Sequence, residues 1–347
     1  MKFLKKIIVS LNIALVIALL LAYLSPYVDP NESWVFSIFG LVYPVLLIAN
    51  LVMVVAWLFI DYKYLFLSLV AILVGLSHIK GFVNVNSTNA APSDLKILAY
   101  NLAFSYSLRS GTKEARAKNK NDLKTFFGSQ NDIDIFCLQE SSSFSRNILK
   151  EIYPDYYNHE VERRGTFIFS RYPIIRHGEI SFGTSTNSCL WADIQFQNET
   201  IRIYNMHLQS NQVSKDAVKI IDNGNLQEKK TWVGIRGILN KYRSASRVRA
   251  HQSKKVADHA AKSLHPTVIC GDVNDPPTSF IYNRICGDYQ DSFIEAGKGI
   301  GTTYAGKIPM LRIDYIFVDE QFEVNSFDIL TEKFSDHYAV KGGYRIR

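Results

Sequence analysis

Cysteine is scarce in this 347-residue chain: the four cysteines are Cys137, Cys189, Cys270 and Cys286. Two of them, Cys137 and Cys270, lie inside apolar strand-like runs, where a cysteine usually packs as a small buried hydrophobic residue. The sequence therefore gives no sign of a disulfide framework, even in a compartment that would permit one. Internal repeats and low-complexity segments are also lacking, which argues against a repeat architecture.

Charge is nearly absent from the first 79 residues, which hold only four basic and three acidic side chains: Lys2, Lys5, Lys6 and Lys63, with Asp29, Glu32 and Asp61. The whole chain carries +7 and this segment +1, so the remainder carries +6. Apolar runs at 7–24, 34–60 and 64–79 fill the segment, and each approaches or exceeds the roughly 20 residues of a membrane-spanning helix. Residues 1–80 are therefore predicted to be a membrane anchor with about three transmembrane helices.

The first apolar run could instead be a signal peptide, because three lysines precede it. No small-x-small cleavage site follows it and two more apolar runs come next, so a retained anchor is favoured. Pro44 would kink the second run without excluding it from a membrane. The lysines before the first run, with none at 25–33, place the N-terminus in the cytoplasm. Three spans of the cytoplasmic (inner) membrane would leave the rest of the chain on the outer, periplasmic side.

Residues 81–94 are small and polar and contain Pro92, which is typical of a linker, so the globular domain is expected at 95–347. Strand-like runs outnumber helical ones there, and several end in a polar side chain. The run that begins at Leu95 ends in Asn101, the run at 134–140 ends in Glu140, and a predicted hairpin at 191–206 is followed by His207. Taken alone, such a histidine is more often a satisfied core residue.

The run at 268–277 is the most informative, because Asp272 and Asn274 follow an apolar strand and a glycine and precede two prolines. Side chains two apart on an extended backbone point the same way, so both would project from the strand end into one site. The alternative is an ordinary Asx-Pro turn. Near the C-terminus, Asp314 lies in the middle of the apolar run 311–318, and Asp336 and His337 precede the last run, 338–340.

Residues 210–263 are polar and helical in pattern. Trp232, Ile235 and Leu239 are spaced three and four apart among basic residues, which indicates a basic amphipathic helix. Such a stripe more often packs on its own domain than on a membrane. A second helix is expected at 246–261.

The strand-end side chains together are mostly hard oxygen donors with two imidazoles: Asn101, Glu140, His207, Asp272, Asn274, Asp336 and His337, with Asp314 behind them. Oxygen donors of this kind suit Mg²⁺ or Mn²⁺ better than a metal that prefers thiolate. Because Mg²⁺ uses few protein carboxylates, it leaves coordination positions for a phosphate. Hydrolysis of a phosphoester is the chemistry that this set predicts.

The order of these motifs resembles the endonuclease/exonuclease/phosphatase superfamily, whose DNase I-like fold is a four-layer α/β/β/α sandwich. The matching runs are Tyr100-Asn101, Leu138-Gln139-Glu140, Ser170-Arg171-Tyr172-Pro173, Asn205-Met206-His207-Leu208, Gly271-Asp272-Val273-Asn274, Arg312-Ile313-Asp314-Tyr315 and Ser335-Asp336-His337. Each run is weak alone, but their order across the whole domain is specific. The membrane-like N-terminus departs from secreted or nuclear members of the family.

The resemblance implies a role for each residue, stated here as an expectation. Glu140 would be the principal metal ligand, with Asn101 and Asp336 as further candidates. Asp272 and Asn274 would orient the water or the phosphate, and His337, held by Asp314, would be a general base or a phosphate contact. His207 would be a general acid or phosphate donor, as in DNase-like members. Asp272 and His337 are joint candidates for the base.

Several functions remain open at this point. A phosphodiesterase is slightly favoured over a phosphomonoesterase, because the His207 match follows the diesterase members. The alternative to an enzyme is a catalytically silent domain that binds a phosphorylated partner. A surplus charge of +6 suits a nucleic acid, whereas membrane anchoring and the stripe at Trp232 suit a lipid headgroup.

Overall fold

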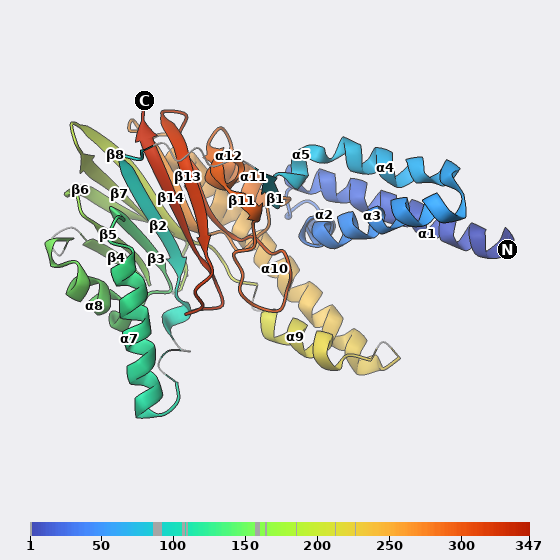
Figure 1. Ribbon diagram of the computed structural model, residues 1–347, viewed down its shortest axis with the longest axis horizontal. Helices are drawn as coiled ribbons and strands as arrows, with labels where there is room; N and C mark the ends of the chain where they lie inside the picture. Colours follow the sequence, from blue (N-terminus) through green and yellow to red (C-terminus); the bar gives the residue numbers. More distant parts are fainter. Residues whose placement is uncertain are drawn as a thin grey trace.

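The computed structural model describes residues 2–85, 92–105, 108, 110–156, 160–163, 165–184, 186–211, 213–225 and 227–347. Residues 86–91, which belong to the expected linker, lie outside the described residues. The chain forms a helical N-terminal bundle, residues 2–80, and a larger domain of strands and helices beside it (Figure 1).

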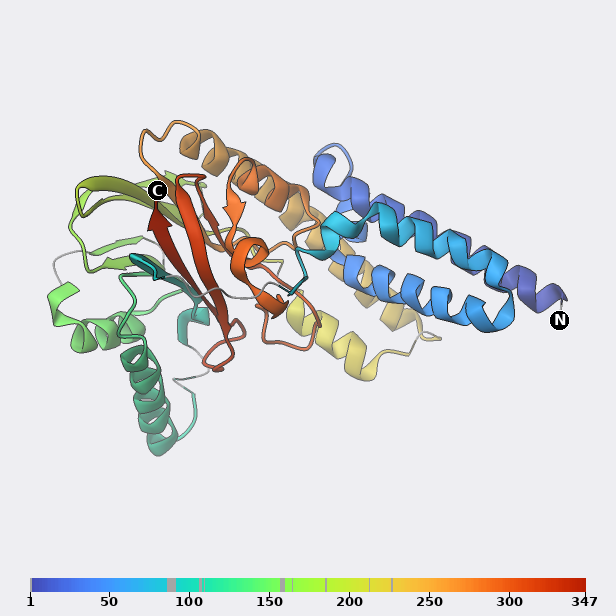
Figure 2. The same cartoon turned by 45° about the horizontal axis from the view of Figure 1, so that its top comes forward.

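The N-terminal bundle consists of α1 (Lys2–Leu24), α2 (Trp34–Leu41), α3 (Tyr43–Ile60), α4 (Leu65–Val74) and α5 (Leu76–Ile79). Helices α1, α3 and α4 lie side by side in both views (Figures 1 and 2). Lys5 near the start of α1 forms an ion pair with Asp61 just after α3, whereas the Tyr23 hydroxyl donates to the Ala71 carbonyl, 3.1 Å away. Helices α1 and α4 therefore run in the same direction and α3 runs against them.

Two of these helical segments, Phe3–Tyr27 and Tyr43–Ile60, are long and apolar enough to cross a membrane. The second apolar run was expected to be one kinked helix, but the structure divides it at Val42 into α2 and α3. Pro44 lies in the first turn of α3, where a missing backbone N–H costs nothing, so it starts a helix instead of kinking one. The third run is shorter than a span, because Gly75 separates α4 from α5.

Buried polar side chains connect α1, α3 and α4 of the N-terminal bundle. Asn12 Nδ2 donates to Ser68 Oγ (2.5 Å), Ser68 Oγ donates to Asn50 Oδ1 (2.8 Å), and Trp57 Nε1 donates to Asn12 Oδ1 (2.6 Å). Hydrogen bonds between helices hold them together where no hydrophobic driving force separates helix from lipid. These contacts tie α1, α3 and α4 together inside the bundle.

The larger domain contains two six-stranded sheets. The first sheet has the strand order β13 (Phe322–Leu330), β14 (Ala339–Ile346), β2 (Leu95–Asn101), β3 (Ile135–Gln139), β5 (Thr166–Ser170), β4 (Glu160–Arg163). The second has the order β10 (Gln290–Asp291), β12 (Asp314–Val318), β9 (Thr267–Asp272), β8 (Glu199–His207), β7 (Ser188–Phe196), β6 (Ile174–Ser181). Each sheet has one parallel pair, β2 with β3 and β8 with β9, and its other pairs are antiparallel.

The two sheets pack face to face, and helices cover their outer faces (Figure 1). The inner core contains side chains from both sheets, such as Ile97, Cys137, Ile203 and Cys270. Helices α7 (Lys113–Ser129) and α8 (Ser143–Ile152) pack on the first sheet, and α10 (Lys229–Ala260) and α11 (Phe280–Cys286) on the second. The predicted four-layer sandwich is therefore confirmed. All four cysteines are free thiols.

Two local predictions were wrong. Asp314 starts strand β12 and does not lie in its middle, because the preceding residues 311–313 bond to the loop at Thr303 and Tyr304. The two helices expected at 232–239 and 246–261 are one continuous 32-residue helix, α10. The intervening residues 240–245 contain no proline, so nothing in the backbone chemistry requires a break.

The N-terminal bundle is docked on the domain by strand pairing and hydrogen bonds. Within the expected linker, β1 (Val83–Val85) pairs with β11 (Lys298–Ile300) of the domain. Thr278 Oγ1 donates to the Gly40 carbonyl (2.7 Å), and the Tyr242 hydroxyl donates to the Ser37 carbonyl (3.1 Å). Because α2 supplies both carbonyls, the bundle and the domain meet over a defined surface.

Candidate active site

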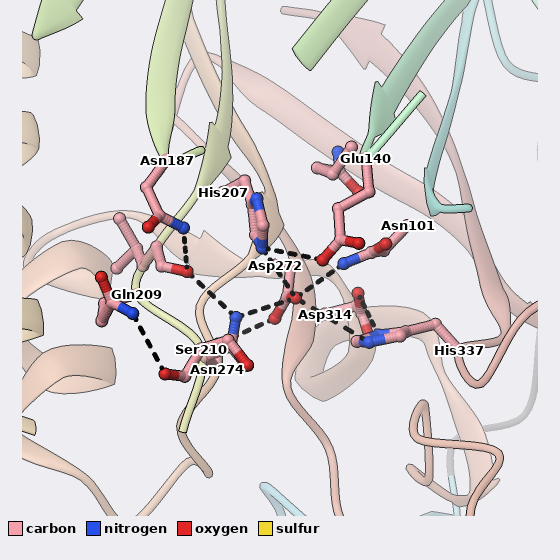
Figure 3. A network of polar contacts seen from close by, with 12 residues as sticks. Asn101, Glu140, Asn187, His207, Gln209, Ser210, Asp272, Asn274, Asp314 and His337 are labelled. Atoms are coloured by element: carbon pink, nitrogen blue, oxygen red, sulfur yellow. Dashed lines mark hydrogen bonds and ion pairs between the residues drawn. The ribbon is translucent and has the colours of Figure 1, made fainter. Parts of the chain in front are cut away.

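The predicted site residues converge where the two sheets meet (Figure 3). Strands β2 and β3 are parallel neighbours, and so are β8 and β9 in the other sheet, so their carboxyl ends lie at one edge. These four ends deliver Asn101, Glu140, His207 and Asp272, in the positions expected from the sequence. His207 and Asp272 are register partners in the ladder between β8 and β9.

A buried amide network joins the two sheets directly beneath the site. Asn205 Nδ2, from β8, donates to the carbonyls of Leu138 (3.0 Å) and Phe167 (2.9 Å) in the opposite sheet. Gln139 Nε2 donates to Asn205 Oδ1 at 2.6 Å. The network fixes the end of β3 against β8, so it positions Glu140 relative to His207. Sequence reasoning assigned no role to Asn205, although a polar residue inside an apolar strand is a signal for such a link.

The backbone at the strand ends adopts conformations that few residues tolerate. Gly271 has φ 125°, and a Cβ there would lie 2.1 Å from the Met206 carbonyl oxygen. Only glycine therefore allows β9 to approach β8 so closely. Glu140 (φ 46°) and Asn274 (φ 58°) both occupy the left-handed region. Such strain concentrates at functional sites, where the surrounding structure imposes it.

Asp272 is the centre of the hydrogen-bond network. Its Oδ2 accepts from Asn101 Nδ2 (2.9 Å) and Asn274 Nδ2 (2.9 Å), and its Oδ1 accepts from the Asn274 backbone N–H (2.8 Å). Burial raises the pKa of the Asp272 carboxyl to about 6. The predicted pairing of Asp272 with Asn274 is confirmed as a contact, and Asn101 joins them from the other sheet.

His337 is held by Asp314, as the sequence suggested. His337 Nδ1 lies 3.0 and 3.1 Å from the two Asp314 carboxylate oxygens, and Nε2 lies 3.9 Å from Asp272 Oδ2. Asp314 is also the register partner of Asp272 across β9 and β12. Burial alone would lower the pKa of His337, but the charges of Asp314 and Asp272 outweigh burial and raise it to about 10.

Glu140 and His207 face each other across the edge of the site. Glu140 Oε1 lies 3.3 Å from His207 Nε2, and burial raises the pKa of Glu140 while it lowers the pKa of His207. Within the described residues, Glu140 has no ion pair with lysine or arginine, and neither nitrogen of His207 has a hydrogen-bond partner. Both groups therefore keep binding capacity for something that is not part of the protein.

The donor set suits a divalent cation. Side-chain atoms of Asp272, Asp314 and His337 lie within 4.8 Å of one another, and all three residues are buried. A cationic His337 donates from both nitrogens and cannot itself bind a metal ion, so the carboxylates of Glu140, Asp272 and Asp314 are the candidate donors. These three carboxylates outnumber the one cation, so the cluster has unbalanced negative charge. Asp336, the third expected ligand, has an exposed side chain on the cavity wall.

These groups open into a cavity of about 280 Å³. Glu140, Asp272 and His337 line one end of it. Much of the remaining wall comes from apolar segments that sequence reasoning missed, and polar Ser210, Asn211 and Tyr304 also line it. The apolar segments are Leu41, Val42, Pro44 and Val45 of the N-terminal bundle, and Ile308, Pro309, Met310 and Leu311 of the domain. No chemical signal marks apolar residues of this kind, so only the fold could bring them to the site.

A buried ion pair fixes the loop after β9. Arg249 of α10 donates to both carboxylate oxygens of Asp275 at 2.9 Å, and its third contact is the Gln209 carbonyl at 2.8 Å. The single O–H of Tyr242 is shared between Asp275 Oδ1, at 3.0 Å, and the Ser37 carbonyl, at 3.1 Å. Because Tyr242 binds α2 as well, one side chain connects the loop beside Asp272 with the N-terminal bundle.

The comparisons with known proteins agree with this geometry. A family model described as "Endonuclease/Exonuclease/phosphatase family" matches residues 84–337, and one described as "Domain of unknown function (DUF8431)" matches residues 5–82. A search of the curated proteins found no match.

Two solved structures illustrate the likeness in fold. One is mannosyl-6-phosphatase Bt3783 of Bacteroides thetaiotaomicron VPI-5482, with 20% identity, coverage of 73% of this chain and 100% of that chain, and a TM-score of 0.50. The other is D. rerio TDP2 complexed with a single-strand DNA product, with 17% identity, coverage of 72% and 98%, and a TM-score of 0.52. At these identities the likeness concerns the fold alone.

Proposed function

The chain belongs to the endonuclease/exonuclease/phosphatase family, and from this premise we propose that it is a phosphoesterase that depends on a divalent metal ion and hydrolyses its substrate with an activated water. Members of the family are phosphoric ester hydrolases. The observation that carries the proposal is the convergence of Glu140, Asp272 and His337 at one end of a single cavity. Every position of the motif holds a chemically competent residue, which disfavours a silent binding domain.

We propose that Glu140 holds the metal ion, Mg²⁺ or Mn²⁺, with Asn101 and Asp336 as further ligands. The support is that Glu140 has no lysine or arginine partner among the described residues, and that it bonds to Asn101, whose amide also contacts Asp272. When bound, such an ion polarises a phosphate oxygen and stabilises charge in the transition state.

The remaining residues would handle the water and the phosphate. We assign Asp272 as the acceptor of the water's proton, because its carboxylate is held by Asn101 and Asn274. His337 directs Nδ1 to Asp314 and Nε2 toward Asp272, so Nε2–H can donate to a phosphate oxygen. The water oxygen bonds to phosphorus, the bond from phosphorus to the leaving oxygen breaks, and the leaving alcohol gains a proton.

His207 supports a phosphodiester over a phosphomonoester as the substrate. It is a buried imidazole without a hydrogen-bond partner among the described residues, 3.3 Å from Glu140. Such a group can protonate or contact the leaving oxygen, which diesterase members of the family require. A phosphomonoesterase is the second candidate, and one of the structural neighbours is a phosphatase by name.

Removal of divalent metal is expected to abolish turnover of a generic phosphodiester, such as bis(p-nitrophenyl) phosphate. Without the ion, the carboxylates at Glu140 and Asp272 would repel an anionic substrate. The measurement is the rate in excess chelator, followed by addition of Mg²⁺ or Mn²⁺, which should restore it. Turnover that persists undiminished in chelator would contradict the proposal.

We also propose that the N-terminal bundle anchors the chain in the cytoplasmic membrane, with the domain outside. The lysines near residue 5 lie at the end of α1 remote from the domain (Figure 1), so a cytoplasmic N-terminus places the domain on the opposite side. Although α4 is short, it runs parallel to α1 and returns the chain to the domain's side.

A reporter cysteine in the expected linker at 81–94 tests this topology. After Cys286, the one native cysteine that is not fully buried, is replaced with serine, the linker cysteine should react with an impermeant thiol reagent in intact cells. Any outer envelope must first be opened, and a matched cysteine at Lys6 should react only after lysis. Protection of the linker cysteine would mean that the third apolar run does not span the membrane.

A further inference from the structure

The lining of the active-site cavity includes two chemically different groups of residues. Glu140, Asp272 and His337 cluster at what we call the polar end. Val42 and Val45 of the N-terminal bundle also line the cavity, and they are 36% and 61% exposed. These valine side chains offer no hydrogen bond to a sugar or a base, but they suit a hydrocarbon chain.

A loop of the domain adds further apolar side chains to the wall. Ile308, Pro309 and Met310 line the same cavity as the start of α3. Met310 has φ 54°, a conformation that its neighbours must impose on a side chain of this kind. The two apolar segments therefore create an apolar passage between the catalytic groups and the outer surface of α3.

The size of the cavity limits what it can enclose. A pocket that surrounds a whole drug-sized ligand has a volume of roughly 300–1,000 Å³. The cavity here has about 280 Å³, which is enough for a phosphorylated headgroup and not for a lipid with its chains. An amphiphile that used this cavity would have to leave its hydrocarbon outside.

Helix α3 continues the apolar passage along its outer surface. Val45, Ile48 and Val52 are spaced three and four residues apart, so they lie on one face of the helix, and their exposures are 61%, 49% and 60%. The face begins at the cavity wall and runs along the proposed membrane span. The hydrocarbon tail of a substrate that left the cavity along this face would therefore meet lipid hydrocarbon and not water.

The α9–α10 hairpin, made of α9 (Ser214–Asn223) and the start of α10, extends past the domain beside the N-terminal bundle (Figures 1 and 2). Arg243 of α10 lies over the Trp34 ring, 5.4 Å from its centre, and Arg247 donates to the Pro30 carbonyl at 3.3 Å. Nearer the start of α10, Trp232 and Val233 are 57% and 62% exposed among basic residues. A basic amphipathic helix that lies beside the N-terminal bundle suits the surface of an anionic bilayer.

The lining of the cavity argues against a nucleic acid. Binding of a polyanion depends on lysine and arginine contacts to several phosphates. No lysine or arginine lines the cavity in the part of the chain that the structure describes. The surplus positive charge of the chain therefore lies elsewhere.

We propose that the substrate is a phosphoester lipid of the bilayer, whose phosphate group enters the polar end while its hydrocarbon leaves between Val45 and Met310 along α3. The inference rests on the proposed phosphoesterase function and anchor, and it adds the class of substrate and its route. The N-terminal bundle is then part of the substrate site as well as an anchor.

The test compares two substrates for the full-length protein reconstituted in vesicles of phosphatidylethanolamine, phosphatidylglycerol and phosphatidic acid. Lipid hydrolysis is followed by phosphorus NMR, and bis(p-nitrophenyl) phosphate serves as the soluble substrate. Val45→Asn should lower the ratio of lipid to soluble kcat/KM on the order of tenfold, as expected when an apolar contact is lost. Met310→Gln, in the domain loop, should lower the same ratio.

Val70→Asn is the matched control, because Val70 is 53% exposed on α4, away from the α3 face, and does not line the cavity. Its ratio should equal that of the wild type. The inference is overturned if no lipid is hydrolysed, if single-stranded DNA or RNA is hydrolysed faster than lipid, or if the Val45 and Met310 variants leave the ratio unchanged. If the wild-type protein shows no metal-dependent turnover of the soluble ester, the proposed function is refuted instead.

Discussion

Glu140→Gln is expected to lower kcat/KM for bis(p-nitrophenyl) phosphate about a thousandfold while the fold stays intact. A bound metal ion contributes several kcal/mol of charge stabilisation in the transition state, and each ~1.4 kcal/mol is tenfold in rate. Glutamine keeps the shape of the side chain and removes its charge, so the ion would bind weakly. The Mg²⁺ concentration needed for half-maximal activity should rise as well.

A matched control for this substitution is Glu323→Gln, the same chemical change at an exposed position of β13. It should leave both the rate and the Mg²⁺ dependence unchanged. Circular dichroism and thermal unfolding of the Glu140 variant should match the wild type, because Glu140 has no lysine or arginine partner among the described residues. Wild-type turnover by Glu140→Gln would remove Glu140 from the metal site.

Asp272→Ala and His337→Ala should each reduce the rate about a hundredfold to a millionfold, which corresponds to several kcal/mol of transition-state stabilisation. Asp272 is the acceptor for Asn101 and Asn274, and His337 Nε2 lies 3.9 Å from its Oδ2. Asp314→Asn should cost less, since an amide oxygen can still accept from His337 Nδ1.

The pattern of combined variants distinguishes direct from indirect roles. If Asp272 and His337 act in the same step, the double alanine variant should be little slower than the worse single variant. His177→Ala, at an exposed position of β6, is the control for loss of a histidine and should have wild-type kinetics. A rate near that of the wild type for either single variant would show that the assigned roles are wrong.

The polar half of the candidate site could be predicted from the sequence because each of its residues is attached to a strand end. Asn101, Glu140, His207 and Asp272 follow apolar runs directly, and the topology of two parallel pairs brings those ends together. Asp314 was expected in the middle of a strand, but the residues before it contact the loop at Thr303 and Tyr304, so β12 begins only at Asp314. Its proposed pairing with His337 holds nonetheless.

The other half of the cavity could not be predicted, because its residues carry no chemical signal of their own. Val42 and Val45 look like any apolar residues of the bundle, and only the docking of α2 through Ser37 and Gly40 places them in the wall of the cavity. The sequence predicted two helices where the structure has the single helix α10. Residues 240–245 in its middle are polar, and the tertiary contacts of Tyr242 that stabilise them cannot be read from the local periodicity.

The docking of the N-terminal bundle has a consequence for shortened forms of the protein. A chain that begins at Leu95 would retain all the residues of the proposed catalytic set, but Thr278 and Tyr242 would lose their partners in α2 and β11 would lose β1. The cavity would also lose the wall at Val42 and Val45 and become an open groove. Such a fragment would accept small soluble esters without regard to their shape, so its substrate range would describe the fragment and not the whole protein.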